Sequence, residues 1–445
     1  MEDPILDVTL DVGASTVQIL LLACKLELAT AFGTSHSSTS FRNNALLVLK
    51  LDGIFLGIGE AGLPPKKLHV YEADMNDCKE YVLGFIESIH STKKQSVVDP
   101  QKMFEHLPDC YFSCFRSTPS NEAGHRPVRP IFPLLLQALD NVNCTISRCS
   151  FGRAGRSLVE STILSACAHD CRLTTQELIG VPLEAPSHLS FYTAALNEDI
   201  SLIVQAAKFG AQFTPQLKIK LNGDVDMSRR ILKALDAALP ATEGHHWSID
   251  ANCGWSPEVA LCMLKEVLGP YTHRIFMVEQ PFPVDIVSQA QDPEVARQWR
   301  GVKSAFNSAD MLLFADESMR TCDDVVQLEP FVNGVNIKLE KCGGFIAALR
   351  AVEEARRHAL HIWFGCMVGS NVNSTTTAQL FSLACASDLD GALLVTPGSQ
   401  LFEGGFSYTK PNGNLSLFSD EIGFSHGIGV VPKDLFATVY CQKEE

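Results

Sequence analysis

The second half of the sequence alternates short apolar segments with longer amphipathic segments, and this alternation restricts the possible folds more than any other feature. Candidate strands lie at 189–196, 216–221, 246–252, 274–280, 311–318, 334–340, 361–366 and 385–395. Between some of them, residues 227–239, 257–268, 345–359 and 375–385 have the apolar spacing of amphipathic helices. Strands that alternate with helices predict right-handed βαβ units and a parallel sheet.

Two forms of such a sheet fit this rhythm, a closed (β/α)₈ barrel and an open doubly wound sheet. Eight units within about 200 residues favour the barrel. No GxGxxG or GxxxxGK[ST] motif follows any of the strands, so the dinucleotide-binding and P-loop versions of the open sheet lose their main support. We therefore predict an α/β protein with a barrel domain at 189–395.

Residues 1–188 lack the alternation and predict a separate α+β domain. Strand-like segments at 25–32 and 44–62 flank a Ser/Thr-rich loop at 34–40, and the second segment contains a hairpin turn at Asp52-Gly53. Helical patterns follow at 77–90 and 156–170. Residues 396–445 return to turns and short strands, which we expect to pack back on the first domain.

The charge and cysteine content exclude several classes of partner. The 445 residues include 36 Lys plus Arg and 51 Asp plus Glu, and the net charge of −15 argues against nucleic acid and anionic membranes. The apolar run at 19–24 is too short for a membrane span and has no basic segment before it. Fifteen cysteines without CxxC pairs suggest reduced thiols, so we expect a cytoplasmic protein. A homo-oligomer is the default expectation for a soluble enzyme.

Polar residues stand at the ends of five successive candidate strands, where the chemistry of a parallel barrel gathers. Taken singly, each has an ordinary explanation, since lysines protect exposed strand edges and aspartates terminate strands in turns. A suitable group at every one of five ends is improbable by chance. These residues are Lys218 and Lys220, then Asp250 and Asn252, then Glu279, then Asp316 and Glu317, and finally Lys338.

This set predicts a metal site between two basic groups. Asp250, Glu279 and Asp316 would converge from three neighbouring strands, and clustered carboxylates that repel one another favour a hard cation such as Mg²⁺. Lys220 and Lys338 would lie on opposite sides of that metal. A lysine whose pKa is lowered by burial and cationic neighbours can exchange a proton at neutral pH.

The same residues resemble the enolase superfamily, and within it the muconate-lactonizing subgroup, most closely its dipeptide epimerases of the L-Ala-D/L-Glu type. The segments "LKIKL", "SIDANCGW", "VEQPF", "FADES" and "NIKLEKCGG" carry the resemblance, and "DGIFLGIGEAG" resembles the hairpin of the family's capping domain. The resemblance implies a modified (β/α)₇β barrel, capped by the N-terminal domain and the C-terminal segment. It also implies an isomerase.

The resemblance further implies a role for each residue of the set. Lys220 and Lys338 would exchange the proton α to a carboxylate on opposite faces, and Lys218 would help to neutralise that carboxylate. Mg²⁺ held by Asp250, Glu279 and Asp316 would stabilise the enediolate, the arrangement that is general for this superfamily. Asn252, Glu317 and Lys341 would orient these groups.

The substrate is indicated by "SDLDG", in which Asp388 and Asp390 lie two residues apart. Such a segment is also a common turn. By resemblance, the two carboxylates would bind the α-ammonium of a dipeptide, with Ser37, Cys366 and Met367 as further contacts. The alternatives are an N-acylamino-acid racemase, an o-succinylbenzoate synthase or a cycloisomerase of the same subgroup, or a catalytically silent barrel used for binding. Ser37 stands where relatives that act on glutamate carry an arginine, with Arg42 further on, and Gly369 stands where many relatives carry a glutamate.

Overall fold

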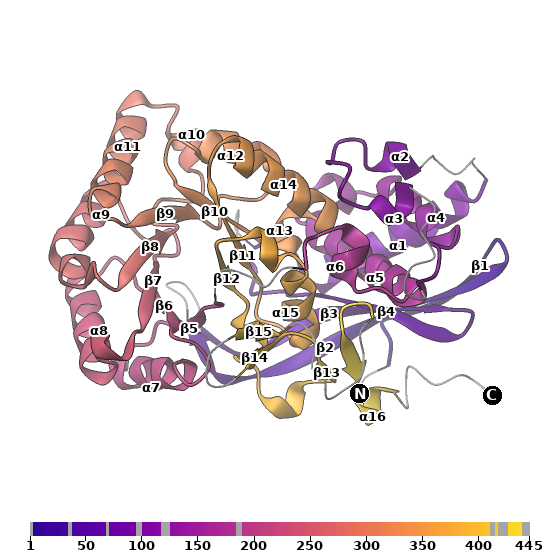
Figure 1. Ribbon diagram of the computed structural model, residues 1–445, viewed down its shortest axis with the longest axis horizontal. Coiled ribbons are helices and arrows are strands. Elements are labelled where there is room, and N and C mark those ends of the chain that lie inside the picture. The colour runs from indigo at the N-terminus through magenta and orange to yellow at the C-terminus, as the bar shows by residue number, and fades with distance from the viewer. Residues whose placement is uncertain are drawn as a thin grey trace.

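Eight parallel strands form a nearly closed barrel in the computed structural model, which describes residues 3–33, 38–67, 71–94, 100–116, 125–183, 189–409, 414–416 and 426–437 (Figure 1). Their order around the sheet follows the chain, and Phe191 N donates to Ser387 O at 2.9 Å where the last strand meets the first. The strands are β5 (Tyr192–Ala194), β6 (Gln216–Lys220), β7 (His246–Asp250), β8 (Ile275–Glu279), β9 (Leu312–Ala315), β10 (Gly334–Ile337), β11 (His361–Gly365) and β12 (Ala386–Asp388). The predicted barrel is confirmed.

Helices surround the barrel on its outer side (Figure 1). They are α7 (Ile200–Gly210), α8 (Val225–Ala238), α9 (Pro257–Met263), α10 (Ile286–Gln289), α11 (Pro293–Asn307), α12 (Cys322–Leu328), α13 (Leu339–Cys342), α14 (Phe345–Arg357) and α15 (Asn371–Ala378). The prediction of a last helix at 375–385 is wrong in register. The helix begins four residues earlier because the Ser370 side chain caps it, accepting a hydrogen bond from Val372 N at 3.1 Å.

An aromatic cluster fills the barrel interior beneath the strand ends. It consists of Phe191, Met277, Phe314, Trp363 and Ala386, all buried. Lys218 lies directly above this cluster, with its ammonium 6.0 Å from the Trp363 ring centroid. The inward faces of the strands are therefore apolar in the lower part and charged at the mouth, as barrel packing requires.

The capping domain contains a four-stranded antiparallel sheet and a layer of helices (Figure 1). Its strands are β1 (Leu6–Val12), β2 (Ser15–Gly33), β3 (Ser38–Leu51) and β4 (Ile54–Ala61). Its helices are α1 (Met75–Thr92), α2 (Pro100–Met103), α3 (Ser113–Arg116), α4 (Ile131–Asp140), α5 (Gly152–Cys171) and α6 (Thr175–Ile179). The expected hairpin turn is present, since Asp52 and Gly53 have φ of 55° and 75°.

The C-terminal segment packs against the capping sheet. It contains β13 (Phe402–Gly404), which pairs with β16 (Val430–Pro432), β14 (Ser407–Thr409), which pairs with β15 (Asn414–Ser416), and α16 (Asp434–Phe436). Phe402, Ile428 and Phe436 belong to one buried cluster with Leu20 and Leu22 of β2. The C-terminal segment thereby completes the cap, as the resemblance implied for the fold.

Three buried carboxylates connect the cap to the barrel. Glu160 of α5 accepts a hydrogen bond from Ile346 N at the start of α14, at 2.9 Å. Glu340 of α13 accepts one from Gly62 N at 3.1 Å, and Glu60 of β4 accepts one from Ser370 N. Two of these contacts lie at helix N-termini, where carboxylates are favourable. The cap is therefore fixed over the mouth of the barrel.

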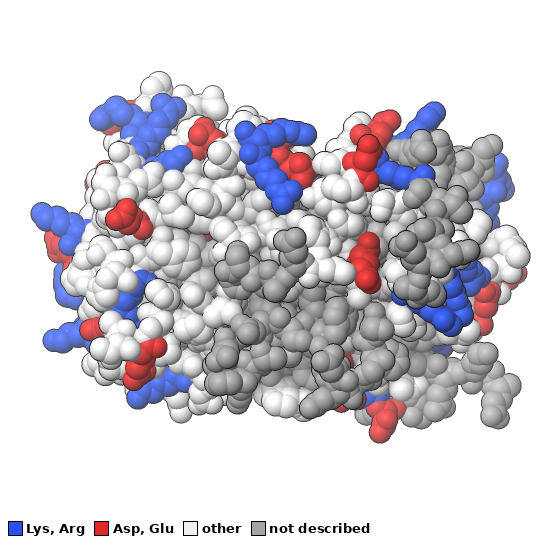
Figure 2. All heavy atoms as spheres, viewed as in Figure 1, with Lys and Arg blue, Asp and Glu red and all other residues white. Residues whose placement is uncertain are grey.

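No helix in the described part of the chain is long and apolar enough to cross a membrane. On the face drawn in Figure 2, basic and acidic side chains are interspersed. That face carries no field of a single sign that would attract a polyanion.

Candidate active site

Three carboxylates lie side by side at the carboxyl ends of neighbouring strands. Asp250 and Glu279 are the last residues of β7 and β8 and are paired in register, and Asp316 directly follows β9. All three are at most 2% exposed. The structure thus places the three predicted metal ligands at the ends of neighbouring strands.

Lys218 lies among carboxylates. Its Nζ is 2.7 Å from Glu279 Oε2, 2.8 Å from Asp388 Oδ2 and 3.3 Å from Asp250 Oδ2. Burial lowers the pKa of this ammonium, but the charges of Asp388 and Glu279 outweigh burial and raise it well above its usual value. Lys218 is therefore a fixed positive charge at the floor of the site.

Lys220 and Lys338 face the site from opposite walls, because β6 and β10 are four strands apart in a sheet of eight. Lys220 Nζ donates to Asp250 Oδ2 at 2.6 Å and to Asn252 Oδ1 at 2.9 Å. Lys338 Nζ donates to Asp316 Oδ2 at 2.8 Å. The expectation of a lowered lysine pKa is not met at Lys338, because the charge of Asp316 outweighs burial and raises it.

Further polar residues hold this set in place. Lys341 Nζ lies 2.5 Å from Asp316 Oδ1 and 3.2 Å from Asn336 O, and Asn252 Nδ2 donates to Glu317 Oε1 at 3.1 Å. Asn336 was missed by the sequence reading, although its amide donates to Glu279 Oε1 at 2.6 Å. A signal was available, since Asn336 shares the inward face of β10 with Lys338.

The carboxylates fit a divalent cation by their chemistry. Burial, followed by the charges of Asp250 and Asp316, raises the pKa of Glu279 to about 7 against the effect of Lys218. Glu317 Oε2 is buried without a hydrogen-bond donor among the described residues. Among the described residues, no three acidic, His or Cys side chains are arranged as ready metal ligands. The ammonium groups of Lys218, Lys220 and Lys338 contact the carboxylates instead. Asp250, Glu279 and Asp316 are the groups that would hold Mg²⁺.

Asp388 and Asp390 close the site on the side of β12 and β5. Asp390 Oδ2 accepts a hydrogen bond from Thr193 N at 2.5 Å, and Asp388 Oδ1 lies 3.3 Å from Thr193 Oγ1. Burial, and then the neighbouring charge of Asp388, raises the pKa of Asp390 well above its usual value. Asp388 already contacts the Lys218 ammonium at 2.8 Å, so the pair presents carboxyl groups of unlike environment at this side of the site.

The cap forms the roof of a cavity of about 260 Å³ above these groups. Cys366 and Met367, which were predicted as substrate contacts, line it, whereas Ser37 lies outside the described residues. The sequence reading missed the segment that follows β4, which contributes the lining residues Pro64, Pro65, Lys67 and Tyr71. Burial raises the pKa of Tyr71 well above its usual value, and the charges of Asp316 and Glu317 add to this effect. The site is therefore closed by the cap as well as by the barrel.

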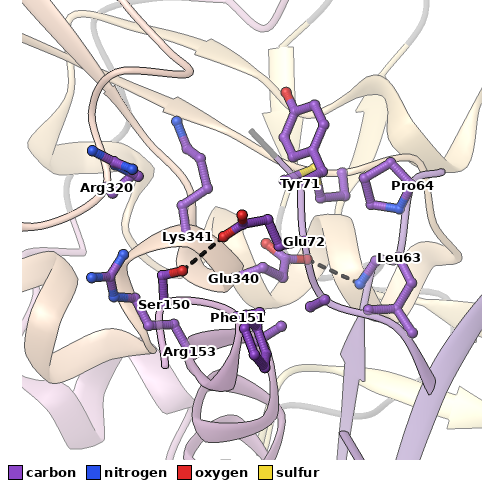
Figure 3. Close-up of a pocket in the computed structure, with 14 residues that line it drawn as sticks. Leu63, Pro64, Tyr71, Glu72, Ser150, Phe151, Arg153, Arg320, Glu340 and Lys341 are labelled. Carbon is purple, nitrogen blue, oxygen red and sulfur yellow. Dashed lines mark hydrogen bonds between the residues drawn. The ribbon is translucent and has the colours of Figure 1, made fainter. Parts of the chain in front are cut away.

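A second, smaller cavity lies behind this roof, between the cap and α13 (Figure 3). Pro64, Tyr71 and Met367 line both cavities. Figure 3 shows the Tyr71 ring and the Lys341 side chain extending to the same side, away from the Ser150 and Glu72 pair. Tyr71 thus forms part of the wall between the second cavity and the candidate active site.

Residues 202–409 match the family model described as "Enolase C-terminal domain-like". An enolase superfamily member of Dictyostelium discoideum is 32% identical over 434 residues, which cover 94% of this chain and 97% of that protein. The chain belongs to the enolase superfamily. The predicted family membership is confirmed, and the matched superfamily members include epimerases and racemases, in line with an isomerase.

Bacterial members of the superfamily match over a shorter length. An L-Ala-D/L-amino acid epimerase of Maribacter is 34% identical over 207 residues, which cover 46% of this chain and 53% of that protein. The chain thus matches about half the length of this bacterial relative. Among solved structures, a dipeptide epimerase of Enterococcus faecalis V583, complexed with Mg and L-Leu-L-Tyr, has a TM-score of 0.66 at 19% identity, covering 93% of this chain and 98% of that one. This likeness shows the shared fold.

Proposed function

We propose that the protein is a Mg²⁺-dependent dipeptide epimerase that inverts the α-carbon of the C-terminal residue. The observation that carries the proposal is the placement of Lys220 and Lys338 on opposite walls of one cavity, with Asp388 and Asp390 on a third side. Bacterial epimerases of L-Ala-containing dipeptides among the relatives support this choice.

The residues of the chain divide the chemistry between them. One lysine removes the proton from the α-carbon, and the lysine on the other face returns a proton, so that the configuration inverts. Lys218 holds positive charge near the substrate carboxylate while the enediolate exists. Asp388 and Asp390 bind the α-ammonium and thereby fix the α-carbon between the two lysines.

A bound divalent cation would add positive charge at the substrate carboxylate. When bound by Asp250, Glu279 and Asp316, Mg²⁺ would supply positive charge that stabilises negative charge on the substrate carboxylate. Because Asp316 raises the pKa of Lys338, neutralisation of the Asp316 charge would remove the main cause of that raised pKa. Lys338 would then be able to act as a base nearer neutral pH.

The proposal is tested by hydrogen exchange in D₂O. The full-length protein is incubated with Mg²⁺ and a dipeptide library, and deuterium at the α-carbons is read by mass spectrometry. We expect exchange at the C-terminal α-carbon, which stops on addition of EDTA. Absence of exchange with every dipeptide would refute the activity, and exchange that survives Lys220→Ala combined with Lys338→Ala would refute the two-lysine mechanism.

A second candidate is a racemase of N-acylated amino acids, because the relatives include an N-acetyl-D-glutamate racemase of Pseudoalteromonas. Such substrates carry no α-ammonium. Asp388→Ala therefore separates the candidates: for a dipeptide epimerase we expect a loss of roughly a hundredfold in kcat/KM, the value of a lost charge-assisted hydrogen bond at a buried group. The racemase would be favoured if both the wild type and Asp388→Ala turned over N-acetyl amino acids faster than dipeptides.

A further inference from the structure

The second cavity lies where the cap meets the barrel, and one arginine from each domain lines it. Arg153 stands in the first turn of α5, and Arg320 stands in the segment between β9 and α12. Both residues are partly buried. Figure 3 shows the two guanidinium groups on the same side of the cavity, apart from the carboxylates of Glu72 and Glu340. The cavity therefore places two permanent positive charges at the boundary between the domains.

The two guanidinium groups differ from that of the next arginine of α5 in having no counter-charge. Arg156 lies 2.6 Å from a carboxylate oxygen of Asp140. Among the described residues, no carboxylate lies within 4.0 Å of the Arg153 or Arg320 guanidinium, and neither guanidinium donates a hydrogen bond. Arg320 donates only its backbone N–H, to Asp324 Oδ2 at 3.0 Å.

The two carboxylates that line the same cavity are bound to other groups. Glu72 accepts a hydrogen bond from Ser150 Oγ at 2.7 Å. Glu340 accepts hydrogen bonds from Gly62 N at 3.1 Å and from Asn373 Nδ2 at 2.5 Å. These contacts hold both carboxylates away from the arginines, whose charges are left without a direct partner in the described part of the chain.

Arg153 also stands where a positive charge is unfavourable. The first turn of a helix is the positive end of its dipole, and α5 has neither an acidic residue in that turn nor a side-chain cap. Burial, and then the charge of Arg320, lowers the pKa of Arg153, although the charges of Asp324 and Glu72 oppose this effect. An anion between the two guanidinium groups would offset both repulsions.

The size of the cavity restricts which anion can enter. Its volume of about 50 Å³ exceeds the space that a single water needs, but it is far below the roughly 300–1,000 Å³ of a pocket for a drug-sized ligand. Each guanidinium presents a planar fork of donors that matches phosphate oxygens, and two such charges match a doubly charged oxyanion. We propose that Arg153 and Arg320 bind a free inorganic oxyanion of the phosphate type, which links the cap to the barrel. This site does not depend on the proposed epimerase function.

Isothermal titration calorimetry with inorganic phosphate tests the site, using the full-length protein in EDTA at about pH 8 and constant ionic strength. We expect saturable binding of one phosphate per chain to the wild type. Arg153→Met and Arg320→Met, which remove one charge from each domain, should each raise the Kd roughly tenfold to a hundredfold. Arg300→Met removes an exposed arginine of α11 that lines neither cavity, and it should leave the Kd unchanged.

Two further titrations separate this site from other ways of binding phosphate. Lys220→Met combined with Lys338→Met removes two cations of the candidate active site and should keep the wild-type Kd for phosphate. Glycerol 3-phosphate carries the same kind of anion on a larger molecule, so the small cavity should bind it at least about tenfold more weakly.

Four outcomes would overturn the proposal. They are the absence of saturable binding, an unchanged Kd in either arginine variant, loss of binding in the double lysine variant, and equal affinity for glycerol 3-phosphate. Thermal unfolding in chloride checks that each variant folds, and phosphate should raise the midpoint of the wild type but not that of a folded arginine variant. Because the arginines belong to different domains, one variant still decides the question if the other does not fold.

Discussion

Two lysines separated by a single residue have different surroundings at the barrel mouth. Lys218 and Lys220 share the inward face of β6, as strand alternation predicts. Lys218 contacts Glu279 and Asp388 and lies deeper, whereas Lys220 contacts Asp250 and Asn252 beneath the cavity. The first is suited to hold charge and the second to move a proton.

Replacing one of the two opposed lysines should separate the two epimers of a substrate. Lys220→Met removes the proposed base on one face, so in D₂O only the epimer whose α-hydrogen faces Lys338 should exchange, and Lys338→Met should show the opposite selectivity. Epimerisation should fall by about a hundredfold to ten-thousandfold in either variant, since a general base typically contributes a factor of 10²–10⁴. Proton NMR of the separate epimers measures both effects.

The outcome that contradicts the arrangement is the same epimer exchanging in both variants. That result would mean that the two lysines act on one face of the substrate. Lys341→Met is unsuitable as a control, because Lys341 contacts Asp316 directly.

At the residue scale, the sequence predicted the barrel contribution to the site but not the contribution of the cap. Strand periodicity places side chains on a face, and parallel strands place their ends together, so Lys218, Asp250 and Lys338 could be found from pattern alone. Lys67 and Tyr71 follow β4 in an irregular segment. Their approach to the barrel depends on contacts between domains far apart in sequence, which no local pattern encodes.

At the scale of elements, the buried contacts between cap and barrel explain why residues 344 and 369 are glycines. Gly344 precedes α14 with φ of 111°, and a Cβ there would lie 2.6 Å from Glu160 Oε1. Gly369 precedes α15, and a Cβ there would lie 2.8 Å from Glu60 Oε1. Glu60 thus occupies the space beside position 369, and a side chain at that position would collide with it.

The pair Gly343 and Gly344 allows the joint at α14 to be tested. Both have positive φ, so an alanine is strained at either, but a Cβ at Gly343 would meet only Arg153 and Arg156 side-chain atoms at 3.5 Å or more. Each substitution should cost about 1–2 kcal/mol through backbone strain. Gly344→Ala should cost about 1–3 kcal/mol more, because it displaces a buried carboxylate from the start of α14.

Urea denaturation of the two variants measures this difference directly. Equal destabilisation would show that Glu160 does not restrict the residue before α14. The pair keeps the chemical change and the sign of φ constant. Gly344 has ψ of −169° and Gly343 has ψ of 27°, so the difference contains the greater backbone strain at Gly344 as well as the contact with Glu160.

At the scale of the whole molecule, the site exists only where the two domains meet. The barrel supplies the lysines and carboxylates, and the cap supplies the roof at Pro64, Lys67 and Tyr71. The eight-stranded order and the general presence of a cap were predictable from strand rhythm and motif resemblance. The buried contacts between cap and barrel were not predictable, because a contact such as that of Glu160 with α14 depends on the packing of helices from separate domains.

The buried contact between Glu160 and α14 should make the free energy of unfolding depend on pH. Glu160 is fully buried, and burial raises its pKa to about 7 although Arg156 and the amide of Ile346 oppose the effect. Between the usual glutamate pKa and about 7, the folded protein retains a proton that the unfolded chain has released. Stability therefore falls as pH rises through this range, by roughly 3 kcal/mol for a shift of this size.

Glu160→Gln removes this titration while keeping the shape of the side chain. We expect the free energy of unfolding of the wild type to fall more steeply than that of Glu160→Gln between pH 5 and pH 8, measured by urea denaturation at each pH. Glu80→Gln makes the same change on the exposed face of α1 and controls for the substitution. Parallel pH profiles for the wild type and Glu160→Gln would mean that Arg156 and the start of α14 hold Glu160 ionised. The cap would then be bound to the barrel by a charged contact at neutral pH, because a carboxylate without its proton can only accept hydrogen bonds from α14.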